Sequence, residues 1–139
     1  MSNDEAEGTA KLLTRAREAL EQYLEVFVDD DGALTFRHAD VPCAVQAMLL
    51  ADGLYVLSMT CVVAWDLPND VDTAARAAER GGLALFGTVN VNRNDGLMDV
   101  TLRYTFPAEG LDESALGTML MLVVSGASQL RNDLVGSQQ

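Results

Sequence analysis

The sequence predicts an α+β protein, with a mainly antiparallel, five- to six-stranded sheet against which N-terminal, central and C-terminal helices pack. Three observations predict this class. Apolar residues recur at helical spacing near both ends of the chain. Two pairs of strand-like segments surround Asp-Gly turn signals, and a third pair alternates apolar and polar residues. The length of 139 residues suits a single domain over residues 1–139.

Three helices are predicted. Residues 4–26 place most apolar side chains on one side and most charges elsewhere. Residues 67–82 form a short central helix that carries carboxylates at its start and ends at two glycines. Asp112 can cap a C-terminal helix over residues 113–133. Because this last helix is apolar nearly all round, we expect it to be buried on more than one side.

The strands are predicted in pairs. Two short strands lie within residues 25–38, on either side of an Asp-rich turn. Residues 41–51 and 54–65 form a longer hairpin around Asp52-Gly53. Residues 83–106 form a third hairpin, whose regular alternation predicts one buried and one solvated face.

The 41–65 hairpin is apolar on nearly every position, so the second face of its strands needs a cover. A two-residue loop would pair Ala51 with Leu54 and assign one face to a smaller, flatter set of side chains. This face is the predicted partner or dimer interface, made of Val45, Ala47, Leu49, Leu54, Val56, Ser58, Thr60 and Val62. The bulkier set, which includes Met59, is assigned to the core.

The same register bears on the two cysteines. It pairs Cys43 with Val62 and Cys61 with Ala44, so the thiols would point to opposite faces of the sheet. Both are therefore predicted to be free, reduced and buried.

No catalytic, cofactor-binding or metal-binding residues are predicted. The three adjacent aspartates at 29–31 lack the spacing of a calcium loop and indicate a solvated turn. His38 is the sole histidine and has no obvious nucleophile or further metal ligands beside it. The chain is therefore predicted not to be an enzyme.

The charge balance limits the partners. Asp and Glu number 21 against nine Lys and Arg, which gives a net charge of −12. Such a field repels nucleic acid and anionic lipid, so neither is an expected partner. The acidic N-terminus does not resemble a signal peptide, and the longest apolar stretch is too short to span a bilayer. A cytoplasmic location is expected.

Three segments carry a resemblance to a known family: "LEQYLEVFVDDDGALTF", "GTVNVNRNDGLMDVTLRYTF" and "LDESALGTMLMLVVSGASQLRNDL". Through them the chain resembles the YbjN family, whose fold is that of type III secretion chaperones. The resemblance implies a small acidic homodimer that binds other proteins and catalyses nothing. YbjN relatives are described as sensory-transduction regulators, and secretion chaperones wrap an unfolded effector segment over a hydrophobic surface.

The sequence leaves three candidate functions. The first is a non-enzymatic, homodimeric protein-binding module, a regulator or chaperone-like adaptor, whose partner or client the sequence does not name. The second is a sensor that holds a small apolar ligand on the hydrophobic sheet face. The third is a hydrolase, which the single histidine disfavours.

Overall fold

The computed structural model describes residues 2–136. It contains three helices and one six-stranded antiparallel sheet with the order β1-β2-β3-β4-β6-β5, which confirms the predicted α+β class. The elements follow one another as α1 (Ser2–Leu20), β1 (Phe27–Val28), β2 (Leu34–His38), β3 (Val41–Ala51), β4 (Leu54–Pro68), α2 (Val71–Gly81), β5 (Thr88–Asn94), β6 (Leu97–Pro107) and α3 (Glu113–Val135).

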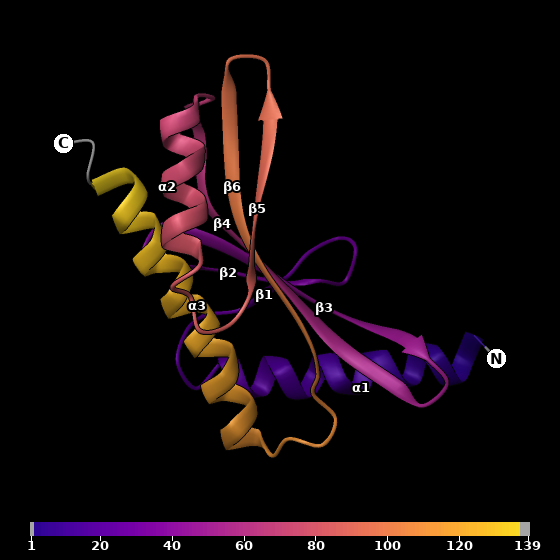
Figure 1. Ribbon diagram of the computed structural model, residues 1–139. Coiled ribbons are helices and arrows are strands. Elements are labelled where there is room, and N and C mark those ends of the chain that lie inside the picture. Colours follow the sequence, from indigo (N-terminus) through magenta and orange to yellow (C-terminus); the bar gives the residue numbers. More distant parts are fainter. Residues whose placement is uncertain (1, 137–139) are drawn as a thin grey trace.

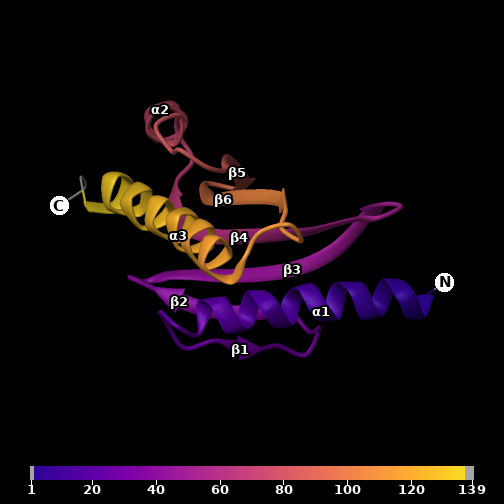
Figure 2. The same cartoon turned by 90° about the horizontal axis from the view of Figure 1, so that it is seen from below.

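All three helices lie on the same face of the sheet. Figure 1 views the sheet nearly edge-on, with α2 and α3 on its left and α1 below it. Seen from below, the strands lie side by side from β1 to β5, with α1 and α3 in front of them and α2 beyond β5 (Figure 2). The opposite face of the sheet carries no helix within residues 2–136.

Two glycines let helices approach the sheet closely. The position of a β-carbon on Gly8 of α1 is already filled by the ring of Tyr55 on β4. The same position on Gly81 of α2 is filled by the side chain of Val89 on β5. In both places a larger residue would push the helix away from the strand beneath it.

The core lies between the helices and the sheet face that they cover. It is built from apolar residues of α1, α3 and the strands, which include Leu12, Ala16, Leu20, Leu34, Phe36, Val45, Leu57, Met59, Val63, Leu102, Leu116, Leu120, Val124 and Leu130. Helix α3 contacts α1, α2 and the sheet, as its largely apolar sequence predicted.

The predicted cap of α3 is confirmed, and one of the carboxylates predicted at the start of α2 caps that helix. Asp70 precedes α2 and accepts a hydrogen bond from the backbone N–H of Thr73 at 2.8 Å, and hydrogen bonding to Thr73 lowers the pKa of the Asp70 carboxyl. Asp112 caps α3 in the same way through the N–H of Ala115, at 2.7 Å. The predicted starts of both helices are confirmed within a few residues.

The predicted end of the first helix is wrong. Helix α1 ends at Leu20 and not at residue 26. The Leu20 carbonyl accepts hydrogen bonds from the N–H groups of both Tyr23 and Leu24, which closes a tight turn. The chain reverses here because Phe27 must reach the edge of the sheet, where it pairs with Thr35.

The predicted register of the long hairpin is also wrong. Ala51 pairs with Leu54, so the two-residue loop exists as predicted. A β-bulge follows between Leu49 and Ala51, where Leu50 is an extra residue with 58% of its surface exposed. Every pair further from the turn is therefore shifted by one residue, and Val45 pairs with Met59.

Candidate functional site

The helix-free side of the sheet is the most open apolar surface of the 41–65 hairpin. Side chains alternate between the two faces along each strand, so a residue next to a core residue points to the helix-free side. We call this surface the open face. It consists of Thr35, Arg37, Pro42, Ala44, Gln46, Met48, Val56, Ser58, Thr60, Val62, Thr101, Arg103 and Thr105.

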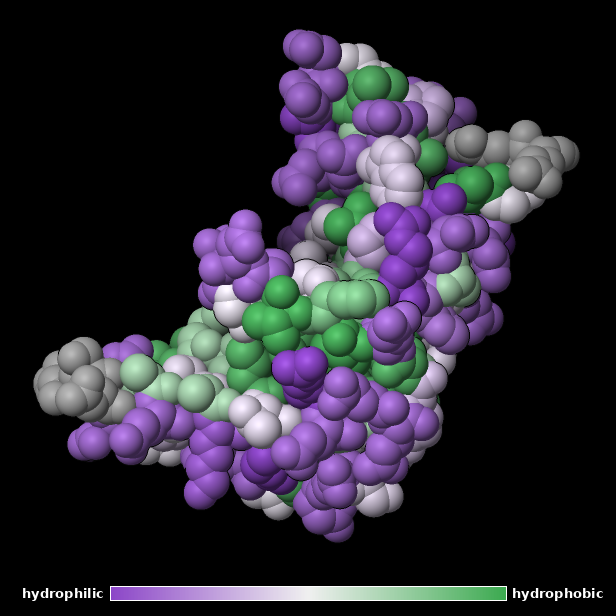
Figure 3. Space-filling model, turned by 180° about the vertical axis from the view of Figure 1, so that it is seen from behind, coloured by the Kyte–Doolittle hydropathy of each residue, from purple (hydrophilic) through white to green (hydrophobic). Residues whose placement is uncertain are grey.

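One half of the open face is hollowed and apolar. A pocket of about 430 Å³ lies over β2, β3 and β4, and opens along the sheet. We call it the apolar pocket; it is lined by Phe27, Thr35, Phe36, Arg37, Pro42, Cys43, Ala44, Thr60 and Val62. Phe27 stands at its rim, because β1 is only two residues long and leaves this ring more than half exposed. Figure 3 views the molecule from the side of β1 and shows hydrophobic side chains gathered near its centre, with hydrophilic ones around them.

The other half of the open face is polar. The Thr105 hydroxyl donates a hydrogen bond to the Ser58 oxygen at 3.1 Å. The Arg103 Nε–H points to the same oxygen at 3.5 Å. Ser58 is itself buried beneath these neighbours. The open face therefore offers an apolar hollow next to a row of hydroxyls and one guanidinium group.

The structure divides the residues predicted as the interface. Val56, Ser58, Thr60 and Val62 lie on the open face, and Leu54 lies beside the turn. The placement of Val45, Ala47 and Leu49 on that face is wrong. They share the helix-covered face with Leu57 and Met59, because the bulge at Leu50 shifts β3 by one residue against β4.

The residues of β1 and β2 at this site were missed by sequence reasoning. Phe27 and Arg37 line the apolar pocket, whereas the predicted interface contains only residues of the 41–65 hairpin. A usable signal was present, since Thr35, Phe36 and Arg37 alternate polar and apolar as a half-buried strand does. Their closeness to Pro42 and Ala44 follows from the pairing of β2 with β3.

The two cysteines lie together and not on opposite faces, so that prediction is wrong. The corrected register pairs Cys43 directly with Cys61, and their sulfur atoms are 3.4 Å apart. Both remain free thiols and both are buried. The contact with Cys43 and burial both raise the pKa of the Cys61 thiol strongly, because each disfavours the thiolate.

This environment leads to a prediction for thiol reactivity. We expect both cysteines of the native protein to react with a thiol reagent about 100-fold more slowly than in denaturant, because both sulfur atoms are buried and the Cys61 thiolate is disfavoured. The measurement is a timed thiol titration at about pH 8, with and without denaturant, on protein prepared without reductant. Denatured protein should give two thiols per chain, and a lower number would mean that Cys43 and Cys61 are bridged.

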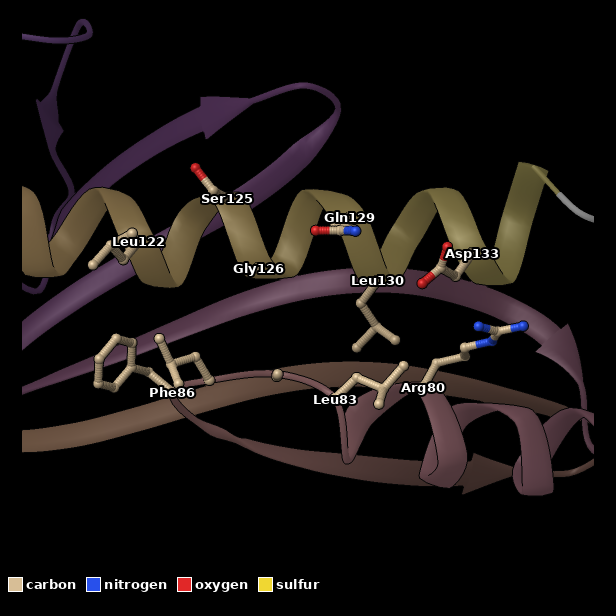
Figure 4. A pocket seen from close by; sticks show the side chains of 11 residues that line it. Arg80, Leu83, Phe86, Leu122, Ser125, Gly126, Gln129, Leu130 and Asp133 are labelled. Atoms are coloured by element: carbon tan, nitrogen blue, oxygen red, sulfur yellow. The ribbon is translucent and has the colours of Figure 1, made fainter.

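A second apolar surface lies on the helix side. Helix α3 and the segment that joins α2 to β5 enclose a groove of about 290 Å³, which we call the α2–α3 groove. Figure 4 shows Leu130 pointing from the helix toward Leu83. Leu83 and Leu85 are 73% and 81% exposed, and Leu122 on α3 is also exposed. In this region, therefore, large apolar side chains are exposed to solvent and not buried in the core.

The aspartates at 29–31 lie in a turn, and His38 lies at the end of a strand. The Asp29 carboxylate accepts hydrogen bonds from the N–H groups of Asp31 and Ala33, both at 2.9 Å, so the acidic run forms a turn as predicted. His38 ends β2 opposite Val41. Within residues 2–136, no three His, Cys, Asp or Glu side chains are grouped as a metal site requires, and no helix is long and apolar enough to cross a membrane.

Comparison with known proteins identifies the fold. No family model and no curated protein matches the sequence. The structure is similar to that of YbjN from E. coli, described as a candidate transcription regulator, with 17% identity, a TM-score of 0.65, and coverage of 91% of this chain and 93% of that one. The chain has a YbjN-like, chaperone-like fold. A chain of the HopA1-SchA chaperone-effector complex is also similar, at 15% identity and a TM-score of 0.53, with coverage of 88% and 92%. At these identities the likeness to YbjN and to that complex is one of fold.

Proposed function

We propose that the chain is a non-enzymatic protein-binding module, a regulator or chaperone-like adaptor, which works as a homodimer. The observation that carries the proposal is the open face, where Phe27, Pro42, Ala44 and Val62 surround an apolar pocket that no helix covers within residues 2–136. Exposed apolar surface rimmed by polar residues is typical of an interaction site. A chain of similar fold occurs in a chaperone-effector complex, which supports a protein as the partner.

The shape of the open face suits an extended segment of another protein. The apolar pocket holds one or a few apolar side chains, and its open mouth lets a chain continue on both sides. Hydroxyl and guanidinium groups beside the pocket, among them Thr60, Thr105 and Arg103, can hydrogen-bond to the backbone of such a segment. An extended peptide uses pockets of this kind for its side chains and polar groups for its main chain.

A small apolar ligand is the second candidate occupant. The volume of about 430 Å³ lies within the range of ordinary ligand sites, which favours this alternative. The apolar pocket would then act as the sensing site of a regulator. The two candidates differ in extent, because a peptide also covers the polar half of the open face and a small ligand does not.

The homodimer is assigned to the other side of the molecule. The α2–α3 groove exposes Leu83, Leu85 and Leu122, whose contact with a second copy would remove this apolar surface from water. Since the groove and the open face lie on opposite sides of the sheet, a dimer formed through the groove leaves both open faces available. Each dimer would then present two partner sites.

Val62→Asp tests the open face. We expect wild-type protein to bind members of an array of short peptides with apolar centres and uncharged flanks, and the variant to bind them about tenfold less, because the carboxylate must be desolvated under the peptide. Val71→Asp is the matched control, since it makes the same substitution at an exposed valine at the start of α2, on the helix-covered side. Native mass spectrometry of the purified protein would detect a small ligand instead. Equal peptide binding by wild type and Val62→Asp would contradict the proposal.

A further inference from the structure

The charge of the open face is opposite to that of the whole chain. The protein carries a net charge of −12, yet the charged side chains of the open face are Arg37 and Arg103. Asp99 lies on the same side of β6 as Arg103 but four residues before it, about 13 Å along the strand, and its carboxylate accepts a hydrogen bond from the backbone N–H of Asp66 at 2.9 Å. The two arginines therefore create a positive region within an acidic surface.

Neither arginine is neutralised by a carboxylate of its own chain. Arg37 and Arg103 are exposed, and neither forms a salt bridge within the described part of the chain. Arg103 directs its Nε–H at the Ser58 oxygen, which is uncharged. Their guanidinium groups are available to a partner.

The two arginines stand on either side of the apolar pocket. Arg37 lines the pocket from β2. On the far side, Thr60 lines the pocket and pairs with Arg103 on β6. Strands β2 and β6 are separated by β3 and β4, and the pairing offsets the two arginines by two residues along the strands, so their backbones are about 16 Å apart.

We propose that the segment bound on the open face carries an apolar anchor flanked on both sides by carboxylates. This inference rests on the proposed function and specifies its partner. An extended chain advances about 3.3 Å per residue, so two acidic residues four positions apart are separated by about 13 Å, and the long arginine side chains reach over the remaining distance. The recognised pattern is an acidic residue, a spacer, the apolar anchor, a spacer and a second acidic residue. Arginine binds carboxylates through paired N–H groups, which fixes the register of the segment over the pocket.

A second copy of this chain does not fit the open face. Two open faces related by a twofold axis would bring the same positive region of each copy together, and the rest of each copy is acidic. A foreign acidic segment is instead attracted locally and repelled elsewhere, which restricts it to this face.

The test is an array of peptides with one central Leu, Phe or Trp and with Glu, Ser or Lys placed two positions to each side. Wild-type protein should retain Glu-flanked peptides about five- to tenfold better than Lys-flanked ones, with Ser-flanked ones between them. The Arg37→Glu, Arg103→Glu double variant should reverse that order. Lys11→Glu, a charge reversal on α1, should keep it, which separates the local effect from net charge. The preference should shrink in about 0.5 M NaCl because salt screens exposed charges.

The outcomes distinguish the two proposals. If Ser-flanked peptides bind as well as Glu-flanked ones, or Lys-flanked ones bind better, the inference is wrong and the protein-binding function stands. If no peptide with an apolar anchor is retained above background, both are wrong.

Discussion

Met59→Asp is expected to unfold the protein, whereas Val62→Asp is expected to leave it folded. Met59 is fully buried on the helix-covered face, among the side chains of the core. A carboxylate there would be desolvated without a partner, at a cost of about 3–5 kcal/mol, which is a large part of the stability of an ordinary domain. Val62 lies only three residues away on the same strand but faces the open side, where a carboxylate remains in water.

Circular dichroism checks this pair of variants. Met59→Asp should lose most of its helical signal or melt at a much lower temperature than the wild type, and Val62→Asp should melt within a few degrees of it. The opposite result, with Met59→Asp folded and Val62→Asp unfolded, would mean that the two faces of β4 are exchanged.

Replacing both Leu83 and Leu85 by Glu is expected to convert a dimer into a monomer. Both side chains are largely exposed beside the α2–α3 groove, so the monomer loses little packing when they change. In a dimer each leucine would contribute about 1.5–3 kcal/mol, and each glutamate would be desolvated instead. Raising the salt concentration should favour the wild-type dimer, because it screens the repulsion between two chains of charge −12.

Light scattering at tens of micromolar protein measures this state. Leu50→Glu is the matched control, because Leu50 is a comparably exposed leucine at the bulge of β3, on a different part of the molecule. The control should remain a dimer, and circular dichroism should show that all variants keep their helices. A monomeric wild type would refute the homodimer, and a dimeric double variant would place its interface elsewhere.

Local signals in the sequence were sufficient for the class of fold and for most elements, although the prediction that the third hairpin starts at residue 83 is wrong, since β5 begins at Thr88. Each of these signals involves only a few neighbouring residues, so it does not depend on how distant parts of the chain fold. They are the Asp-Gly turns, the alternation in β5 and β6, and the caps Asp70 and Asp112. The end of α1 was not readable in this way. Tyr23 and Leu24 continue the helical spacing, and only the need to place Phe27 at the sheet edge ends the helix earlier.

The register of the long hairpin could not be predicted from the same signals. Alternation fixes register only where one face of a strand is polar, and β3 and β4 are apolar on both faces. Leu50 has no side-chain property that marks it as the residue of a bulge. The predicted face therefore agrees with the structure for the residues of β4 and is wrong for those of β3. The part of the candidate site on β1 and β2 depends on strand pairing between distant segments.

Leu50 also determines how this hairpin responds to a change in chain length. Strand β3 holds one residue more than β4 needs, and that residue points largely into solvent. Losing it would join Leu49 directly to Ala51 and leave a regular hairpin, with every other side chain on its present face. The loss of a residue earlier in β3, such as Ala47, would shift the preceding part of the strand by one residue. Its inward-facing and outward-facing side chains would then be exchanged. The same one-residue deletion is therefore neutral for the binding surface at one position and destroys that surface three residues away.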